Sequence, residues 1–392
     1  MLIRRVKRSL CRHLCRKDTG AHTHTVSLRP KGELRGNVLL SFIIEPFLRR
    51  PGEPISHDHT HDWESWQMAQ TFLRLGFAVD VIDYRNHRFE PQRDYDFFIS
   101  ARTNLESIAK RLNGDCVKVA HLDTAHWLFN NHAAYSRLLD LQQRRGITLT
   151  NIKMVEPNRA IEEADLATVL GNRFTMDTYA YAGKSIHRIP ISAPLTYPWD
   201  DDKDFSRCRN NYLWFGSAGF VHKGLDRVLE TFAAMPEYHL TVCGPLDEEP
   251  AFVEAYHKEL FETPNIETIG WIDIGGPEFR KLARSTIGLI YPSCSEGGGG
   301  SAITCMHAGI IPIVTYETSV DIGESGILLA DSTIPTLRQA VQTLSSQPPE
   351  RLRQQARAAW EQARRHHTRE IFAERFERFV TDELSSNRHH NK

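Results

Sequence analysis

Short apolar runs that alternate with longer amphipathic segments are the feature that most constrains the fold of this sequence. In the first half, strands are expected at residues 38–44, 78–83, 95–100, 117–122, 165–170 and 186–191. Helices are expected between most of them. The two clearest, 63–75 and 133–145, each end at a glycine suited to the residue after a helix. Such an order is typical of a parallel sheet covered by helices, which predicts an α/β fold.

The same rhythm starts again after residue 211. Strands are expected at 212–217, 239–244, 287–292 and 312–317, and helices at 223–234 and 250–261. A chain of 392 residues exceeds the size at which single cores stop growing, so two domains are expected. The predicted organisation is a basic extension (1–35), a first Rossmann-like domain (36–192), a proline- and aspartate-rich linker (193–211) expected to be solvated, a second Rossmann-like domain (212–365), and a C-terminal helix and tail (366–392).

Charge is nearly balanced, with 48 basic and 49 acidic side chains, so no overall field favours nucleic acid as a partner. Residues 1–17 are the exception, because they carry seven Arg or Lys and no acidic side chain. Two interpretations stay open for them: peripheral contact with an anionic membrane surface, or a solvated terminus. The seven cysteines are scattered and no secretory signal is recognisable. We therefore expect a cytoplasmic protein, with contact at the inner face of the cell membrane as one of the two interpretations of the basic segment.

The densest chemical signal is PSCSEGGGGSAITCMHAG, residues 292–309, between two expected strands. A glycine run before a helix lets backbone N–H groups approach an anionic ligand, and the helix dipole favours negative charge there. The segment is therefore expected to bind phosphate groups. A flexible loop is the alternative, but four consecutive glycines beside a carboxylate at a strand end favour a site.

A second element, FGSAGFVHKGLDRVLETF at residues 215–232, has a strand that ends in small residues and a helix that opens with Lys-Gly. Together the two blocks resemble the retaining GT-B glycosyltransferases of family 4, and the resemblance covers about residues 212–330. It implies two Rossmann-like doubly wound domains that face each other across a cleft, with the acceptor bound by the first (36–192) and the nucleotide-sugar donor by the second (212–365). The activity it implies is transfer of a sugar from a nucleotide-sugar donor to a glycan, lipid-linked or other hydroxyl acceptor. Transfer is expected to proceed with retention, and with no metal or other cofactor.

The resemblance also assigns residues. Glu296 would meet the donor-sugar hydroxyls and Lys223 would neutralise the leaving diphosphate, so both are catalytic candidates. The other expected donor-binding residues are Gly216, Ser217, Gly244, Trp271, Gly297, Gly298, Gly299, Gly300, Ser301 and Thr304.

Two positions depart from the family pattern. Thr304 stands where a second Glu grips the ribose, and Ser217 stands where an Arg is customary. These departures motivate a second hypothesis, a catalytically silent GT-B-like protein that binds a glycan or a partner. A sugar-nucleotide epimerase on the same fold is a third.

The first half offers histidines as acceptor-side candidates. VAHLDTAHW, residues 119–127, places His121 and Asp123 at the end of an expected strand. His121 is the third catalytic candidate, as a hydrogen-bond partner of the donor sugar or the acceptor. His126 is the alternative, and a purely structural histidine also remains open.

HDHTHDW, residues 57–63, precedes the first long helix, for which Asp62 is the expected N-cap. His61 and Asp62 are expected on the acceptor side, and Glu64 is a further candidate for acceptor hydroxyls. A zinc site is the weaker alternative, because no acidic or thiol ligand has recognisable metal spacing.

Overall fold

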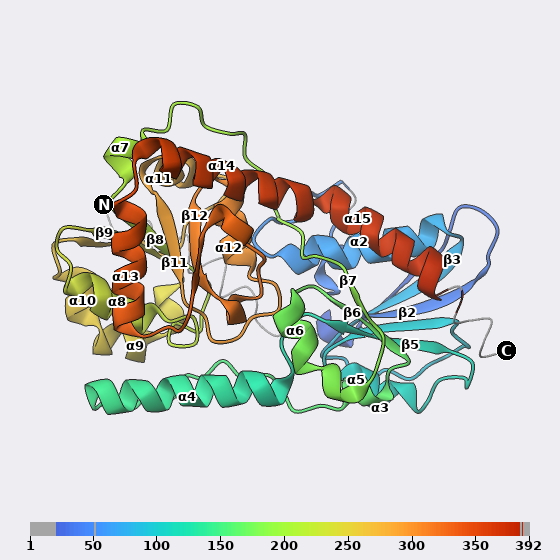
Figure 1. Cartoon of the computed structure of the whole chain (residues 1–392). Helices are drawn as coiled ribbons and strands as arrows, with labels where there is room; N and C mark the ends of the chain where they lie inside the picture. The colour runs from blue at the N-terminus through green and yellow to red at the C-terminus, as the bar shows by residue number, and fades with distance from the viewer. Residues whose placement is uncertain (1–20, 51, 385, 387–392) are drawn as a thin grey trace.

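The computed structural model describes residues 21–50, 52–384 and 386, and its strands form two separate sheets (Figure 1). The first sheet has the order β1-β3-β2-β4-β5-β6-β7 and the second β10-β9-β8-β11-β12-β13. Neighbouring strands are parallel except β1, which pairs antiparallel with β3. The strands are β1 (Thr25–Leu28), β2 (Gly36–Phe42), β3 (Phe77–Asp83), β4 (Phe97–Ala101), β5 (Val117–Leu122), β6 (Leu166–Val169), β7 (Ile186–Arg188), β8 (Asn211–Phe215), β9 (His239–Cys243), β10 (Ile266–Thr268), β11 (Gly288–Tyr291), β12 (Ile311–Thr315) and β13 (Ile327–Leu329).

Ten of these strands lie where the sequence predicts strands, with ends that differ by up to three residues. The apolar runs are continuous because both faces of a parallel sheet are covered, and every residue of β3 and β4 is buried. The sequence analysis missed β1, β10 and β13. Each has only three or four residues and lies at the edge of its sheet, where short strands with partly exposed residues give little apolar signal.

Helices cover both sheets. They are α2 (Thr60–Arg74), α3 (Asn104–Ala109), α4 (Trp127–Arg145), α5 (Ala160–Glu163), α6 (Arg173–Thr178), α7 (Phe205–Cys208), α8 (Leu225–Ala233), α9 (Pro250–Ala255), α10 (His257–Phe261), α11 (Pro277–Ser285), α12 (Gly300–His307), α13 (Ile334–Ser345), α14 (Pro349–His366) and α15 (Arg369–Arg378). The single helix expected at 250–261 is wrong, because the backbone at Tyr256 (φ −113°, ψ 23°) separates α9 from α10.

The start of α2 also differs from the expectation. Asp62 was expected to be its N-cap, but the helix begins at Thr60 and the cap is His59, whose Nδ1 accepts a hydrogen bond from the His61 N–H at 3.2 Å. Asp62 lies instead in the first turn, where the helix dipole favours a carboxylate. Both residues suit a helix start, so the sequence alone did not distinguish them.

The linker also departs from its prediction. Residues 193–211 were expected to be solvated, yet Lys203 is only 5% exposed and its Nζ donates to the Gly309 carbonyl at 2.9 Å. Asp204 caps α7, and Asp200 pairs with Arg284 at 2.6 Å. These contacts hold the segment against the second domain.

The chain ends by returning to the first domain. Figure 1 shows α14 and α15 running along the upper side of the molecule from the second domain to the first. On α15, Phe372 packs against Trp63 with ring centroids 6.0 Å apart, and Phe376 packs against Phe72 at 5.8 Å. Both partners belong to α2, so α15 is part of the core of the first domain.

Within the part of the chain that the structure describes, no helix has the length and apolar character needed to cross a bilayer. The basic segment 1–17, for which membrane contact was one interpretation, lies outside the described residues.

Candidate functional site

A cavity of about 600 Å³ lies between the two domains. Tyr84, Arg102 and Asp123 line it from the ends of β3, β4 and β5, and Gly216 and Gly244 line it from the ends of β8 and β9. The carboxyl ends of both sheets therefore meet at one space. This edge is where doubly wound sheets bind their ligands, and the volume suits a small molecule.

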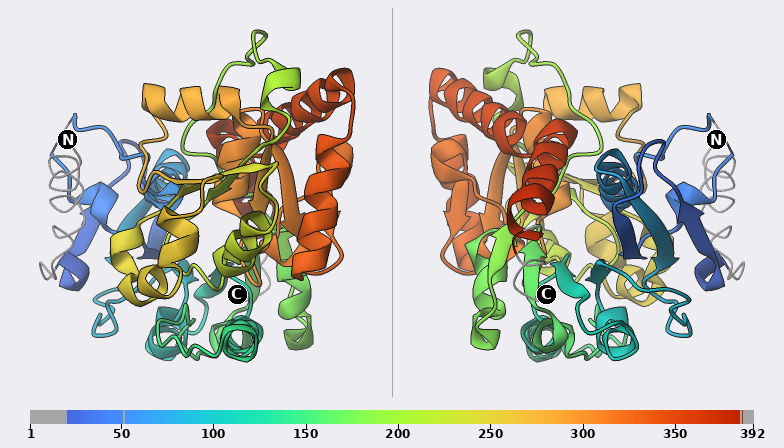
Figure 2. Two further views of the ribbon diagram at one scale, coloured as in Figure 1. Left: turned by 90° about the vertical axis from the view of Figure 1, so that its left-hand side faces the viewer. Right: turned by 90° about the vertical axis from the view of Figure 1, so that its right-hand side faces the viewer.

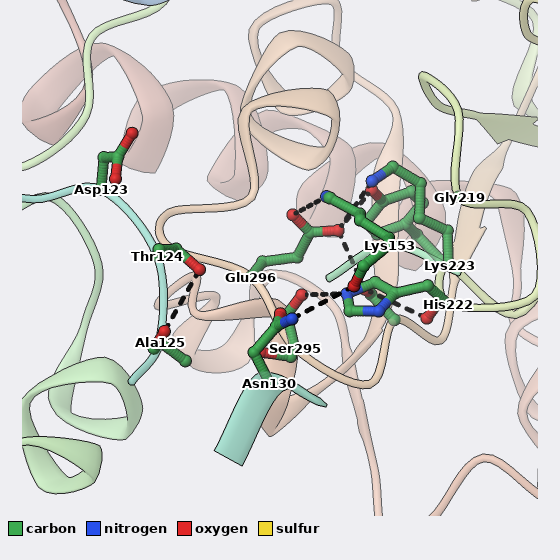
Figure 3. Close-up of polar contacts among 12 residues, drawn as sticks. Asp123, Thr124, Ala125, Asn130, Lys153, Gly219, His222, Lys223, Ser295 and Glu296 are labelled. Atoms are coloured by element: carbon green, nitrogen blue, oxygen red, sulfur yellow. Dashed lines mark hydrogen bonds and ion pairs between the residues drawn. The ribbon is translucent and has the colours of Figure 1, made fainter. Parts of the chain in front are cut away.

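Glu296 is the best-supported side chain in this cavity (Figure 3). Its Oε1 accepts hydrogen bonds from Tyr291 and Ser293, both at 2.9 Å. Lys223 Nζ lies 3.2 Å from the same oxygen, and Lys153 Nζ lies 3.5 Å from Oε2. Two ammonium groups and two hydroxyls thus hold the Glu296 carboxylate directly before the glycine run.

The lysines keep this carboxylate ionised. Burial alone would raise the pKa of Glu296, but the charges of Lys153 and Lys223 outweigh it and hold the pKa well below its ordinary value. Lys223 is only 2% exposed, and this burial lowers its pKa even though Glu296 opposes the shift. The site therefore contains a fixed negative charge between two positive ones.

Two positions of the glycine run require glycine for structural reasons. A Cβ at Gly297 would lie 2.1 Å from the Asp123 carbonyl oxygen, so only glycine allows the two domains to approach here. Gly299 has φ 58°, a left-handed conformation, and it caps α12. The first turn of α12 faces the cavity through Gly300 and Ser301, where unpaired N–H groups favour an anion.

The loop before α8 contributes the Lys223 side chain to the cavity, while its backbone N–H groups are bonded elsewhere. The N–H groups of Gly219 and Phe220 both donate to the buried carboxylate of Glu249, so they are not available to a phosphate. His222 Nε2 donates to the Ser295 carbonyl at 2.6 Å. This bond ties the loop to the glycine run and fixes Lys223 beside Glu296.

A chain of charged groups forms the wall of the cavity in the first domain. His61 Nδ1 lies 2.7 Å from Glu64 Oε2, and His61 Nε2 lies 4.0 Å from Asp123 Oδ2. Arg102 Nη2 donates to the same Asp123 oxygen at 2.9 Å. Burial lowers the pKa of His61, but the bond to Glu64 and the nearby carboxylates outweigh it and raise the pKa above its ordinary value. The surrounding carboxylates therefore favour the protonated form of His61 at the cavity wall.

Glu64 and Arg102 have specific roles in this wall. Glu64 is fully buried and its Oε1 accepts from the Ser192 N–H and hydroxyl, so it orients His61 and does not itself meet an acceptor, contrary to the expectation. Arg102 has φ 61°, a conformation that non-glycine residues adopt at a cost, and its guanidinium lies 4.1 Å from the centre of the Tyr84 ring.

Most of the expected site residues meet at this cavity. Those that line it are His61, Asp123, Gly216, Ser217, Lys223, Gly244, Trp271, Glu296, Gly297, Gly298, Gly299, Gly300, Ser301 and Thr304. The Thr304 hydroxyl donates to the Gly300 carbonyl at 2.9 Å, so its hydrogen is used within α12.

Besides Glu64, three expected residues do not line the cavity. His121 is 1% exposed, and its Nδ1 lies 2.8 Å from Thr168 Oγ1. His126 caps α4 and lies 3.1 Å from the Tyr181 hydroxyl, in a separate hollow. Asp62 is also outside the cavity lining. Strand position alone misled the choice of His121, because it cannot say whether a side chain at the end of a strand points into the sheet packing or out of it.

Sequence reasoning missed Lys153 and Arg102, which both line the cavity. Lys153 lies in an aperiodic stretch between α4 and α5 that carries no motif. Arg102 follows β4 directly, and its place at a strand end was the available signal.

The histidines at 57–61 have separate partners, since His57 pairs with Asp273 at 2.9 Å while His59 caps α2 and His61 bonds Glu64. Across residues 21–50, 52–384 and 386, no group of three or more potential ligands is arranged to hold a metal ion.

Comparison with known proteins identifies the architecture. No family model matches the sequence, and no curated protein matches it. Among solved structures, sucrose-phosphate synthase from Thermosynechococcus elongatus superposes with a TM-score of 0.62 at 14% identity, over 89% of this chain and 99% of that one. Trehalose-6-phosphate synthase from E. coli, bound with UDP-2-fluoro glucose, gives 0.59 at 9% identity, over 89% and 98%. This chain has the GT-B fold.

A third GT-B structure is larger. TarM superposes with a TM-score of 0.51 at 11% identity, over 70% of this chain and 53% of TarM, so this chain spans about half the length of that protein. Since all three identities are below 15%, the likeness shows the GT-B fold alone.

Proposed function

We propose that this GT-B protein is a glycosyltransferase that uses a nucleotide-sugar donor. The observation that carries the proposal is the ionised Glu296 carboxylate, held by Lys153 and Lys223 in the interdomain cavity beside the start of α12. A carboxylate at this point can accept hydrogen bonds from sugar hydroxyls. Lysines and helix N–H groups can stabilise the negative charge that develops on a departing diphosphate.

In the proposed transfer, one bond to the sugar C1 is broken and one is formed. The bond between the sugar C1 and the β-phosphate oxygen breaks, and its electron pair stays on the diphosphate. The acceptor hydroxyl oxygen forms the new bond to C1, and its proton passes to the leaving diphosphate. Retention at C1 and independence from metal follow the resemblance to family 4. The paired lysines supply the positive charge that a metal ion would otherwise provide.

The acceptor is proposed to bind against the first domain. His61, Arg102 and Asp123 offer hydrogen-bonding groups on that wall of the cavity, which suits a hydroxyl acceptor such as a glycan or a lipid-linked glycan. A cytoplasmic location, with peripheral membrane contact through residues 1–17, is part of the same proposal, because such contact would bring a lipid-linked acceptor to the cleft.

The first test is a thermal-shift screen of the protein against UDP-, GDP-, ADP-, dTDP- and CMP-sugars. A donor at about 100 times its dissociation constant should stabilise the fold by roughly 2.7 kcal/mol. UDP-sugars come first because the E. coli GT-B structure binds one. A turnover assay with the stabilising donor should then lose roughly 100-fold or more in Glu296→Gln, while the thermal shift remains. Absence of any stabilising nucleotide would contradict the proposal.

The same turnover assay tests metal independence and retention of the anomeric configuration. Turnover should be unchanged by EDTA, and the NMR coupling constant of the anomeric proton in the product should show the same configuration as the donor. Loss of activity in EDTA that Mg²⁺ or Mn²⁺ restores would overturn metal independence, and the opposite anomer would overturn retention.

A second candidate is a catalytically silent GT-B protein that binds a glycan or a partner. It is favoured by Thr304, whose hydroxyl turns back to the Gly300 carbonyl and leaves no charged group for the ribose. Binding of a nucleotide sugar with no product from any acceptor, and no release of diphosphate, would support this candidate. Product formed without an acceptor would instead indicate an epimerase.

A further inference from the structure

Lys153 belongs to the first domain, but its ammonium lies in the part of the cavity formed by the second domain, which is called the donor half below. It lies between α4 and α5, yet its ammonium reaches Glu296 of the second domain (Figure 3). Its side chain is 40% exposed, whereas the side chain of Lys223 on the other carboxylate oxygen is 2% exposed. The two lysines and Glu296 together carry one excess positive charge, with Lys153 on the accessible side.

The backbone that carries Lys153 is fixed by two buried amides of α4. Asn130 Nδ2 donates to the Lys153 carbonyl at 3.2 Å. Asn131 donates to the Val155 carbonyl and accepts from the Val155 N–H, both at 2.9 Å. These bonds leave the position of the Lys153 backbone little freedom, while its four-carbon side chain can still change rotamer.

Gly219 of the second domain leaves space for the Lys153 side chain. A Cβ at Gly219 would lie 3.0 Å from Lys153 Cδ, and Gly219 has φ 95°, a conformation that only glycine adopts readily. Helix α4 is itself attached to the second domain, because Arg137 donates to the Pro292 carbonyl at 2.6 Å and Arg144 pairs with Asp226 at 2.5 Å. Lys153 is therefore held at the donor half by contacts on both of its sides.

We propose that Lys153 binds the diphosphate of the donor together with Lys223, so that the first domain contributes directly to the donor site and the site selects nucleoside diphosphate sugars over monophosphate-linked ones. The proposal rests on the proposed function. A sugar nucleotide with two phosphates carries one more negative charge than a monophosphate-linked one, and the accessible Lys153 matches that charge. When the donor enters, Lys153 exchanges Glu296 for phosphate oxygens, which leaves Glu296 Oε2 free for a sugar hydroxyl.

Calorimetric titration of nucleotides into matched variants tests this. The nucleoside diphosphate that best stabilises wild type is compared with its own monophosphate. Lys153→Ala should weaken the diphosphate roughly 10- to 100-fold and the monophosphate less than about 3-fold, and Lys153→Arg should recover most of the loss. Lys110→Ala is the control, because Lys110 pairs with Glu163 at 3.6 Å and does not line the cavity.

The alternative is that Lys153 only neutralises Glu296. In that case Lys153→Ala would weaken both nucleotides equally or neither, and this outcome overturns the inference while the proposed function stands. If wild type binds no nucleotide at all, the proposed function fails, and the inference fails with it. A lower melting temperature in Lys153→Ala without a change in the diphosphate-to-monophosphate ratio also counts against the inference.

Discussion

At the scale of single residues, burial and the neighbouring carboxylates decide which histidine can act at the cavity. His61 lies between Glu64 and Asp123, which raise its pKa, and it faces the ligand space. Burial lowers the pKa of His121 to about 4, so its ring is neutral at physiological pH and bonds Thr168 within the sheet. The first is suited to meeting a substrate and the second to stabilising the fold.

The low pKa of His121 predicts acid sensitivity. The unfolded ring has its ordinary value of 6.5, so the unfolded state binds more protons as the pH falls from about 6.5 to about 4. Stability is therefore full above pH 6.5 and decreases through that window, by roughly 3 kcal/mol for this residue. In urea unfolding at pH 7 and pH 4, wild type should lose about this much more stability than His121→Asn, in which the amide can keep the Thr168 bond. Equal losses in both proteins would contradict the prediction.

At the scale of elements, α15 packs against the first domain although it follows directly from helices of the second. Its Phe372 and Phe376 are fully buried against α2. The helix is amphipathic, and its apolar face becomes core through this contact with α2. The first domain therefore depends on α15.

Truncation of Phe376 should reveal this dependence. Phe376→Ala leaves a cavity among Phe72, Phe372 and Phe379, and it should cost roughly 3–5 kcal/mol in the free energy of unfolding. Hydrogen exchange should also rise in the peptide 60–74. Glu374→Ala is the control, because Glu374 forms an exposed pair with Arg378 on the same helix and should change stability by less than about 0.5 kcal/mol. Unchanged exchange in α2 would argue against the dependence.

At the scale of the whole molecule, α4 fastens the domains together. It begins in the first domain and runs under the second in Figure 1, and in the side views of Figure 2 it is seen end-on at the bottom of the molecule. Arg137, Arg144 and Arg145 bond the Pro292 carbonyl, Asp226 and Glu259 of the second domain. Because Asp226 is fully buried, its pair with Arg144 is costly to break from one side.

Removal of one partner should therefore loosen the domain arrangement. Arg144→Gln leaves the Asp226 carboxylate without this ion pair, and it should destabilise the protein by roughly 3–5 kcal/mol or open the cleft, visible as a larger radius of gyration in X-ray scattering. The double variant Arg144→Gln/Asp226→Asn should recover part of the loss. Arg173→Gln, which breaks an exposed pair with Asp177, is the matched control. A single variant as stable and compact as wild type would show that α4 does not fasten the domains.

Much of the architecture follows from local sequence. The ten strands found where predicted are runs whose apolar character reflects burial on both sides of a sheet, and glycines such as Gly146 end helices through their own backbone freedom. The glycine run was also recognisable, because glycines between a strand end and a helix leave N–H groups open to an anion by local geometry. Lys223 was selected through the resemblance to family 4.

The sequence by itself determined two α/β domains and the position of Glu296 and the glycine run at strand ends. Only the tertiary structure decided that Lys153 completes the charge around Glu296, that His61 and not His121 faces the cavity, and that α15 returns to α2. The physical reason is the range of the interactions. Periodicity and turn residues are read within a few positions of the chain, whereas ion pairs and side-chain directions depend on residues that lie tens to hundreds of positions apart.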